Sequence, residues 1–343
     1  MNKILFSIII PLRTIGEGVI KETLPAIASQ SYKHFEVIIL PDAESDQDHK
    51  LTRTYDWLRI IPTPAKKMPG DKRDIGAQDS YGDILAFLDD DALPVKDWLE
   101  NAYTIFDEQT DVVALGGPGL LPPTSSFMEE AIDAVLTSFF TNGALAYRFK
   151  RMAPRYVDDF PSMNLMMRKD VFIRLGGFDN RHWPGEDSKL INKLLHREYK
   201  QVLYDPGVAV YHHRRSDIRG HLKQHKSYGY QRGLFVAEGD ENSQHITYML
   251  PSLFTIYFFL YISGLPFFIP SNNGELFRFI AATPLFLYLV VMIAAATEAF
   301  IKTKKILIIP SVLILVPLTH LSYGTFFLYG YGKAKIKNFL NGF

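Results

Sequence analysis

The chain has 343 residues, and its 37 basic and 37 acidic side chains give a formal net charge of zero, without the basic surface that a nucleic-acid-binding protein needs. Hydrophobic residues make up 47% of the sequence, which is too many for a disordered chain. Because the sequence contains no cysteine, disulfide scaffolds, thiolate metal sites and thiol nucleophiles are excluded.

The N-terminal third alternates short apolar runs with amphipathic stretches, a pattern typical of an α/β domain. Strands are predicted at Phe6–Ile10, Phe35–Leu40, Leu58–Ile60, Ile84–Leu88 and Val112–Leu115. Helices are predicted at Val19–Ser29, Lys72–Ser80 and Lys96–Phe106. These elements predict a mostly parallel sheet covered by helices, and such sheets bind ligands beyond the carboxyl ends of their strands.

Three acidic residues, Asp89, Asp90 and Asp91, follow directly after the predicted strand Ile84–Leu88. Adjacent carboxylates repel one another unless a positive group is held beside them. A hard divalent cation such as Mg²⁺ or Mn²⁺ prefers carboxylate oxygens and leaves coordination positions for substrate phosphates. The segment therefore predicts a site for a metal ion and a diphosphate; the alternative is a group of solvated acids at a helix N-terminus.

A second acidic pair, Glu186 and Asp187, begins a helical pattern that continues through Leu190 and Leu194. From the first turn of that helix, one carboxylate can point into a cleft and act as a base. The alternative is a pair of acids that interacts only with the helix dipole. Residues 125–160, which precede this pair, contain an amphipathic helical pattern but no motif with recognisable chemistry.

The C-terminal part, residues 246–343, differs sharply from the rest because it carries only nine charged side chains. These are Arg278, Lys302, Lys304, Lys305, Lys333, Lys335 and Lys337, with Glu275 and Glu298. Uncharged runs occupy 246–270, 279–297 and 306–332. A helix needs about 20 apolar residues to cross the hydrocarbon layer, so we expect a multi-pass membrane domain rather than long core helices of a soluble domain. Basic and aromatic residues between 221 and 232 suit a connector at anionic lipid headgroups.

The basic residues suggest a topology for this region. The first two runs are expected to form a hairpin, and the lysines within 302–305 that follow it favour the cytoplasmic side of the membrane. This predicts that the N-terminal domain is cytoplasmic. A third crossing would leave Lys333, Lys335 and Lys337 outside, against the positive-inside tendency. The prolines and glycines of the third run also fit a bent, re-entrant or interfacial segment, so both readings stay open.

Taken together, five segments between Phe6 and about Gly233 resemble family 2 glycosyltransferases with the GT-A fold. They are Ser7–Pro11, Ser29–Ile38, Gly82–Asp91, Gly176–Asp179 and Gly185–Leu190. The resemblance implies an α/β catalytic domain with a Rossmann-like, mostly parallel central sheet, followed by an all-α membrane domain. The predicted division is a transferase domain at 1–215, an amphipathic connector at 216–245 and a membrane domain with two to three transmembrane segments at 246–343.

The resemblance also implies a donor site. Asp89 and Asp91 match the metal-binding DxD motif, and His212, which is a better match than His213, falls where relatives place a histidine near the metal; a surface histidine is the alternative. The expected cofactor is Mn²⁺ or Mg²⁺. The remaining donor-site candidates, which would meet the nucleotide or its diphosphate, are Pro11, Arg13, Asp42, Lys72, Arg73 and Asp90.

On the acceptor side, the resemblance assigns Asp187 as the catalytic base, with Glu186 orienting it or touching the acceptor. Asn164, Trp183 and Gly185 fall where the family contacts acceptor sugars. The implied reaction is inverting transfer of a sugar from a nucleotide-sugar donor, UDP- or GDP-linked, to a lipid-linked or glycan acceptor or to a polyprenyl phosphate. Because residues 231–233 do not match the motif of processive synthases, addition of a single sugar is favoured. The alternatives are an inactive transferase-like membrane scaffold and a nucleotidyltransferase of similar fold.

Overall fold

Two units make up the part of the chain that the computed structural model describes, residues 3–66, 68–264 and 274–341. Met1–Pro122 and Tyr147–His213 form one unit, here called the α/β unit. Pro123–Ala146 and Arg214–Phe343 form the other, here called the helical unit. The sequence-based division placed residues 123–146 in the transferase domain, whereas the contacts group this segment with the C-terminal helices.

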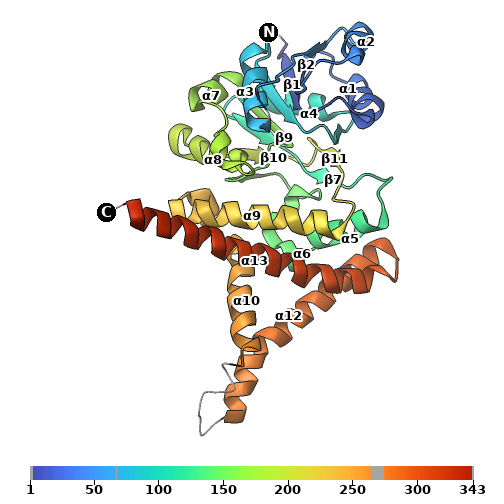
Figure 1. Ribbon diagram of the computed structural model, residues 1–343. Coiled ribbons are helices and arrows are strands. Elements are labelled where there is room, and N and C mark those ends of the chain that lie inside the picture. Colours follow the sequence, from blue (N-terminus) through green and yellow to red (C-terminus); the bar gives the residue numbers. More distant parts are fainter. Residues whose placement is uncertain (1–2, 67, 265–273, 342–343) are drawn as a thin grey trace. The chain divides into compact units, whose positions relative to one another are not determined.

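An eight-stranded sheet forms the centre of the α/β unit, in the order β3-β2-β1-β4-β9-β6-β10-β8 (Figure 1). Strands β1, β2, β3 and β4 are mutually parallel, while β9 runs antiparallel to both β4 and β6. The strand bounds are β1 Phe6–Pro11, β2 Phe35–Leu40, β3 Leu58–Ile60, β4 Ile84–Leu88, β6 Ala114–Gly116, β8 Arg155–Val157, β9 Asn164–Arg168 and β10 Val202–Tyr204. The mostly parallel sheet confirms the predicted fold class.

Both faces of this sheet are covered, which explains why every residue of β1, β2 and β4 is buried. Helices α1 (Leu24–Ala28) and α4 (Trp98–Glu108) pack on the face that carries Ile8. Helix α3 (Pro69–Asp79) lies on the opposite face, where Gly76 approaches Ile9, and α7 (Lys169–Leu175) joins it there through the contact of Phe172 with Phe87. A strand covered on both faces has a nearly continuous apolar sequence, as β1, β2 and β4 do.

A smaller, three-stranded sheet has the order β5-β11-β7, and its strand β5 begins shortly after β4 ends. Strand β5 is Ala92–Pro94, β7 is Gly119–Leu120 and β11 is Val210–His212. The antiparallel pairing of β11 with β5 sets His212 opposite Ala92. Other helices in the described part of the α/β unit are the π-helix Val19–Thr23, α2 Asp46–Thr54, the short 3-10 helix Asn180–His182, α8 Glu186–Lys193 and the π-helix Leu194–Glu198.

The helical unit contains a pair of helices that run side by side, α9 and α13, and two helices that extend away from this pair, α10 and α12 (Figure 1). The helix bounds are α5 Phe127–Thr137, α6 Phe139–Asn142, α9 Ile218–Glu238, α10 Ile246–Ile262, α12 Gly274–Thr303 and α13 Ile308–Asn341. Within the described residues, two stretches, Arg278–Thr303 and Ile308–Leu340, are long and apolar enough to cross a membrane, while α10 is shorter. The end of the first predicted run, 265–270, and the first part of the predicted loop, 271–273, lie outside the described residues, while the rest of that loop belongs to α12.

The segment inserted at 123–146 is held in the helical unit by a buried apolar cluster and by ion pairs. Ala131, Ile132 and Val135 of α5 are buried in the same cluster as residues of α12 and α13. The Asp133 carboxylate accepts a hydrogen bond of 2.9 Å from the buried Arg214 guanidinium and also lies 3.1 Å from Lys302 Nζ. Breaking such a buried pair leaves an uncompensated charge, so this contact fixes which helices α5 packs against.

Candidate functional site

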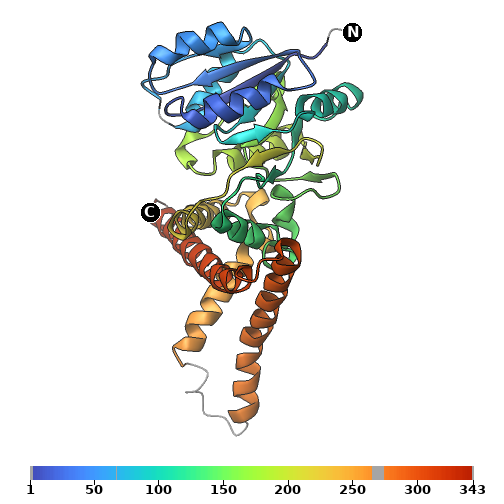
Figure 2. The same ribbon diagram turned by 90° about the vertical axis from the view of Figure 1, so that its right-hand side faces the viewer.

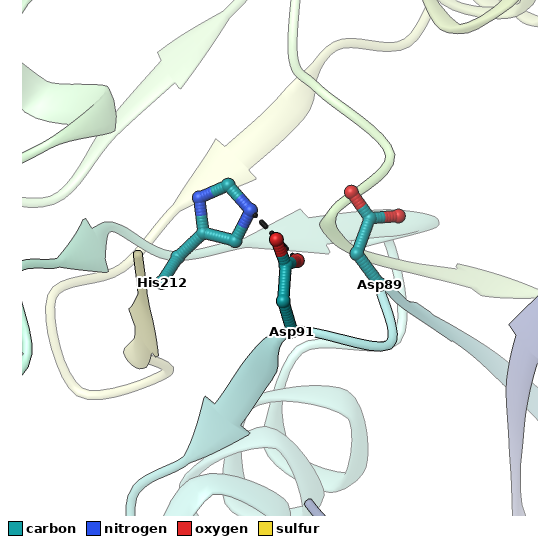
Figure 3. A group of neighbouring side chains, drawn as sticks. All are labelled: Asp89, Asp91 and His212. Atoms are coloured by element: carbon teal, nitrogen blue, oxygen red, sulfur yellow. Dashed lines mark ion pairs between the residues drawn. The ribbon is translucent and has the colours of Figure 1, made fainter. Parts of the chain in front are cut away.

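Two aspartates and a histidine come together at the carboxyl end of β4. Asp89 directly follows this strand, and Asp91 immediately precedes β5. Because β11 pairs with β5, His212 faces this turn, and its Nε2 lies 3.1 Å from Asp91 Oδ1 (Figure 3). One potential ligand atom from each of the three residues lies within 4.8 Å of the other two.

The chemistry of these three side chains fits a divalent cation. Carboxylate oxygens and an imidazole nitrogen are donors that Mn²⁺ accepts, while Mg²⁺ favours the oxygens. Asp90 lies between the two aspartates in the sequence. Desolvation, followed by the negative charges of Asp91 and Asp89, raises the pKa of Asp90 to about 6. A cavity of about 260 Å³ adjoins the group, and its lining includes Thr14, Thr23, Asp90, Asp91 and His213.

Arg73 joins this group to the second acidic pair. Its guanidinium donates a hydrogen bond of 2.7 Å to Asp89 and another of 3.1 Å to Glu186. The residue is only 3% exposed, and its guanidinium carbon lies 5.5 Å from the centre of the Phe178 ring. The sequence had placed Arg73 at the donor diphosphate. In the structure two nitrogens of its guanidinium are engaged by protein carboxylates, so it bridges the two halves of the site.

The other predicted donor residues gather where β1 and β2 end. Lys72 is 2% exposed, and its ammonium group donates hydrogen bonds to the Leu12 and Leu40 carbonyls and to the Asp42 carboxylate. The Asp42 amide donates to the carbonyl of Arg13, whose side chain is exposed. Pro11 is the last residue of β1 and pairs with Leu40. Lys72 therefore fixes Asp42 at the carboxyl end of the sheet, where the resemblance implies contact with the donor nucleotide.

Asp187 lies in the first turn of α8, where two backbone amides hold its carboxylate. Ser188 N donates to Oδ1 at 2.8 Å, and Ser162 N donates to Oδ2 at 3.2 Å. Burial raises the pKa of Asp187 to about 7, with further contributions from the negative charges of Glu186 and Asp159. A base with a pKa near the working pH combines a useful deprotonated population with a favourable proton transfer.

Asp159 is a member of the site that the sequence did not reveal. It is 2% exposed and accepts a hydrogen bond of 2.8 Å from the hydroxyl of Ser188 and one of 3.0 Å from the guanidinium of Arg148. The Tyr147 hydroxyl donates to its backbone carbonyl at 2.9 Å. Ser188 thus binds Asp187 through its amide and Asp159 through its hydroxyl, which connects the two carboxylates through one residue.

The three predicted acceptor-binding residues lie in different surroundings. Gly185 directly precedes α8, with a φ of 124° that favours glycine, and its amide donates to Glu186 at 3.0 Å. Trp183 is 49% exposed. Asn164 is fully buried opposite Leu88, and its amide group bonds the backbone carbonyls of residues 117 and 208 and the indole of Trp98. The hydrogen bonds of Asn164 hold β9 in place, whereas Gly185 and Trp183 lie in the segment that leads to Asp187.

The N-terminal half of the chain matches a known protein family. The family model described as glycosyl transferase family 2 matches residues 7–176. Residues 7–176 belong to glycosyl transferase family 2. The matched range contains the DxD motif and Arg73, and it ends ten residues before Glu186.

Curated relatives of this chain are glycosyltransferases. The glucosyl-dolichyl phosphate glucuronosyltransferase of Haloferax volcanii is 23% identical over 207 residues, which are 56% of this chain and 63% of the relative. Glycosyltransferase AglE of the same organism is 30% identical over 188 residues, 53% of this chain and 58% of the relative. The pre-mycofactocin glycosyltransferase of Mycobacterium tuberculosis is 26% identical over 65% of this chain and 46% of the relative. The alignments therefore span about half to two thirds of the length of these relatives.

Solved structures share the GT-A fold with this chain. The mannosyltransferase PcManGT from Pyrobaculum calidifontis, solved with GDP-Man and Mn²⁺, superposes with a TM-score of 0.56 at 15% identity, covering 92% of this chain and 86% of its own. GalNAc-T7, solved with UDP, GalNAc and Mn²⁺, superposes with a TM-score of 0.50 at 13% identity, covering 74% of this chain and 51% of its own. At these identities the likeness establishes the fold alone.

Proposed function

We propose that this protein is a metal-dependent, inverting glycosyltransferase that moves a single sugar from a nucleotide-sugar donor to an acceptor. The observation that carries the proposal is the pairing of two acidic groups through one buried arginine. Arg73 bonds Asp89 of the cation site and Glu186 of the Glu186–Asp187 pair. A donor diphosphate and an attacking hydroxyl must be held in line, and this arrangement fixes the groups for both.

On the donor side, Asp89, Asp91 and His212 would hold Mn²⁺ or Mg²⁺. When bound, the cation neutralises charge that develops on the departing nucleoside diphosphate. Asp42 would accept a hydrogen bond from the nucleotide base, and the buried Lys72 keeps its carboxylate in position. A carboxylate can accept from an N–H of uracil or of guanine, which supports a UDP- or GDP-linked sugar.

On the acceptor side, Asp187 would take the proton of the attacking hydroxyl as the bond to the anomeric carbon forms. The two amides that bind its carboxylate set its direction, and its pKa of about 7 suits proton transfer near neutral pH. Glu186, held by Arg73 and by the Gly185 amide, would orient the acceptor. A single displacement of this kind inverts the configuration of the anomeric carbon. A phosphate acceptor, which is already ionised, would need Asp187 only for positioning.

A lipid-linked glycan or a polyprenyl phosphate is the acceptor class that we propose, for a protein anchored in the cell membrane with its transferase domain in the cytoplasm. The helical unit supports this class through an apolar cavity of about 440 Å³ between α10, α12 and α13, lined by residues such as Phe254, Phe286 and Leu321. The name of one relative includes a dolichyl phosphate, which agrees with it. The lysines within 302–305 support the cytoplasmic orientation.

The test is turnover of a panel of UDP- and GDP-sugars by the full chain in bilayers, with and without Mn²⁺, in the presence of polyprenyl phosphate or lipid-linked glycans. We expect one donor to be used only with metal, and we expect Asp91→Ala and Asp187→Asn to abolish transfer to a hydroxyl acceptor. Asp170→Asn is the matched control, because Asp170 is an exposed acid on α7 that pairs with Arg174. If no nucleotide sugar binds or reacts while the variants and wild type remain folded, the protein is a transferase-like scaffold instead.

A further inference from the structure

Helices α9 and α13 pack along one another with close backbone contact. A Cβ atom added at Gly229 would lie 2.3 Å from the Tyr323 carbonyl oxygen, and one at Gly233 would lie 2.1 Å from that of Phe327. Nearer the start of α9, His221 Nε2 lies 2.8 Å from Thr319 Oγ1. The contacts on α13 move toward its C-terminus as those on α9 do, so the two helices are parallel. They stay in contact over about three turns.

Helix α9 is too highly charged to cross a bilayer. Its 21 residues include four basic side chains, Arg219, Lys223, Lys226 and Arg232, together with Glu238. Charged side chains at the centre of a membrane are costly and are seldom tolerated on a helix that crosses it. A crossing by α13 would place the adjoining turns of α9 at the same depth. The packing of the two helices therefore argues against α13 as a third transmembrane segment.

The exposed face of α13 supports the same conclusion. Exposed residues recur every four or seven positions and form one stripe along the helix, which is mostly apolar: Ile314, Leu318, Thr325, Tyr329, Ile336 and Leu340. Lys333, Lys335 and Lys337 are exposed beside the C-terminal part of this stripe. A helix with an apolar face and flanking lysines is typical of the boundary between lipid headgroups and acyl chains.

Short connections join the hairpin of α10 and α12 to the pair of α9 and α13, so both ends of the hairpin lie beside this pair. Helix α10 begins at Ile246, shortly after α9 ends at Glu238, and α12 ends at Thr303, shortly before α13 begins at Ile308. Figures 1 and 2 show α10 and α12 extending away from α9 and α13. The lysines within 302–305 lie at this end of the hairpin. Two crossings, out through α10 and back through α12, return the chain to the leaflet from which it left.

We propose that α9 and α13 lie in the plane of the membrane, at the headgroup region of the leaflet where α10 enters and α12 returns. The apolar stripe of α13 faces the acyl chains, and the exposed basic residues of both helices contact anionic headgroups by charge complementarity. The chain then crosses the bilayer twice, and Lys333, Lys335 and Lys337 stay on the same side as the lysines within 302–305. This inference concerns lipid contact and is independent of the proposed transfer reaction.

Because the sequence contains no cysteine, single cysteines report their side of the membrane without background. Glu275→Cys, Lys304→Cys and Lys337→Cys replace exposed residues at the start of α12, after its end and near the end of α13. With a membrane-impermeant maleimide on sealed vesicles of known orientation, we expect positions 304 and 337 to react from one side and position 275 from the other. Reaction of position 337 from the same side as position 275 would overturn the inference.

The depth of α13 is tested by spin labels on cysteines at Ile314, Leu318, Thr325 and Tyr329, in vesicles of phosphatidylcholine with phosphatidylglycerol. An in-plane helix gives similar accessibility to oxygen and to a water-soluble nickel complex at all four positions, at a shallow depth. A crossing helix gives accessibility to oxygen that rises to a maximum at the middle of the segment. Either that maximum or full accessibility to nickel along the stripe would contradict lipid contact in the membrane plane.

Discussion

At the scale of single residues, the pKa of Asp187 sets the pH at which the proposed reaction begins. Burial and the charges of Glu186 and Asp159 raise it to about 7, so below that pH the carboxyl group is protonated and cannot accept a proton. We expect kcat/KM with a hydroxyl acceptor to rise about tenfold per pH unit on the acid side and to level off above pH 7. The pH profile measured at saturating Mn²⁺ checks this. A flat profile from pH 5 to 8 would contradict the role of Asp187 as the base.

Asp159 provides a separate test of what sets this pKa. Asp159→Asn removes one of the negative charges that raise the pKa of Asp187, while an amide oxygen can still accept from the Ser188 hydroxyl. We expect the acid limb of the pH profile to move to lower pH by a fraction of a unit to one unit, with a smaller change in the plateau rate. Asp170→Asn, an exposed acid on α7, should leave the limb unmoved. A loss of rate at every pH without displacement of the limb would assign Asp159 a structural role only.

The residues of the site differ in how far the sequence could predict them. Asp89, Asp91, Glu186 and Asp187 occur in short contiguous motifs at the ends of predicted elements, so their roles could be proposed before any contact was known. Asp159 lies in a segment without a motif, and its partner Ser188 is 29 residues away. Its role depends on folded contacts, which spacing along the chain does not encode.

At the scale of elements, α3 serves the site through consecutive residues. Lys72 bonds Asp42, Arg73 bonds Asp89 and Glu186, and the Asp74 carboxylate accepts from the Phe178 amide at 3.0 Å. Successive residues of a helix point about 100° apart, so this one turn reaches three segments. The sequence predicted α3 to start at Lys72. The structure starts it at Pro69, because proline is well accommodated in the first helical turn.

Replacing Arg73 tests the bridge that α3 provides. Arg73→Met leaves Asp89 and Glu186 without their shared counter-charge, and losing one partner of a buried ion pair typically costs about 3–5 kcal/mol of unfolding free energy. We expect a lower unfolding temperature without metal and a large loss of transfer activity. We also expect Mn²⁺ to raise the unfolding temperature more than it does in the wild type, because a bound cation compensates the negative charge of Asp89.

Thermal unfolding with and without Mn²⁺ measures this effect, and Arg174→Met serves as the matched control because Arg174 forms exposed ion pairs with Asp170 and Glu198. An equal response of Arg73→Met and wild type to Mn²⁺ would show that Arg73 does not act on the cation site.

The third apolar run contains prolines and glycines whose role depends on neighbouring helices. These residues leave a bent, re-entrant or interfacial segment open beside a straight span, and in the structure α13 continues as one helix from Ile308 to Asn341 that contains Pro317. A Cβ at Gly324 would lie 2.4 Å from the Pro251 carbonyl oxygen of α10, and one at Gly330 would lie 2.1 Å from that of Tyr230 on α9. These glycines allow neighbouring helices to approach, so their role is in packing and could not be recognised without the partner helices.

At the scale of the whole molecule, the chain passes between its two units three times, after Pro122, Ala146 and His213. The amphipathic pattern in residues 125–160 predicted a helix with an apolar face, but such a pattern does not identify the surface that covers this face. The structure shows that α12 and α13 cover it, with Asp133 bonded to Arg214. The transferase sequence is therefore interrupted by a segment that depends on the C-terminal helices for its burial.

This dependence predicts how the chain responds to truncation. A chain that ends at His213 retains residues 123–146 but loses α12 and α13, which exposes the apolar face formed by Ala131, Ile132 and Val135. Exposed apolar patches of this kind promote association, so we expect this truncated chain to aggregate. The matched control carries a Gly/Ser segment of the same length in place of residues 123–146, and we expect it to stay monomeric because no such face remains. Size-exclusion chromatography with light scattering compares the two, and equal behaviour would mean that residues 123–146 do not need the C-terminal helices.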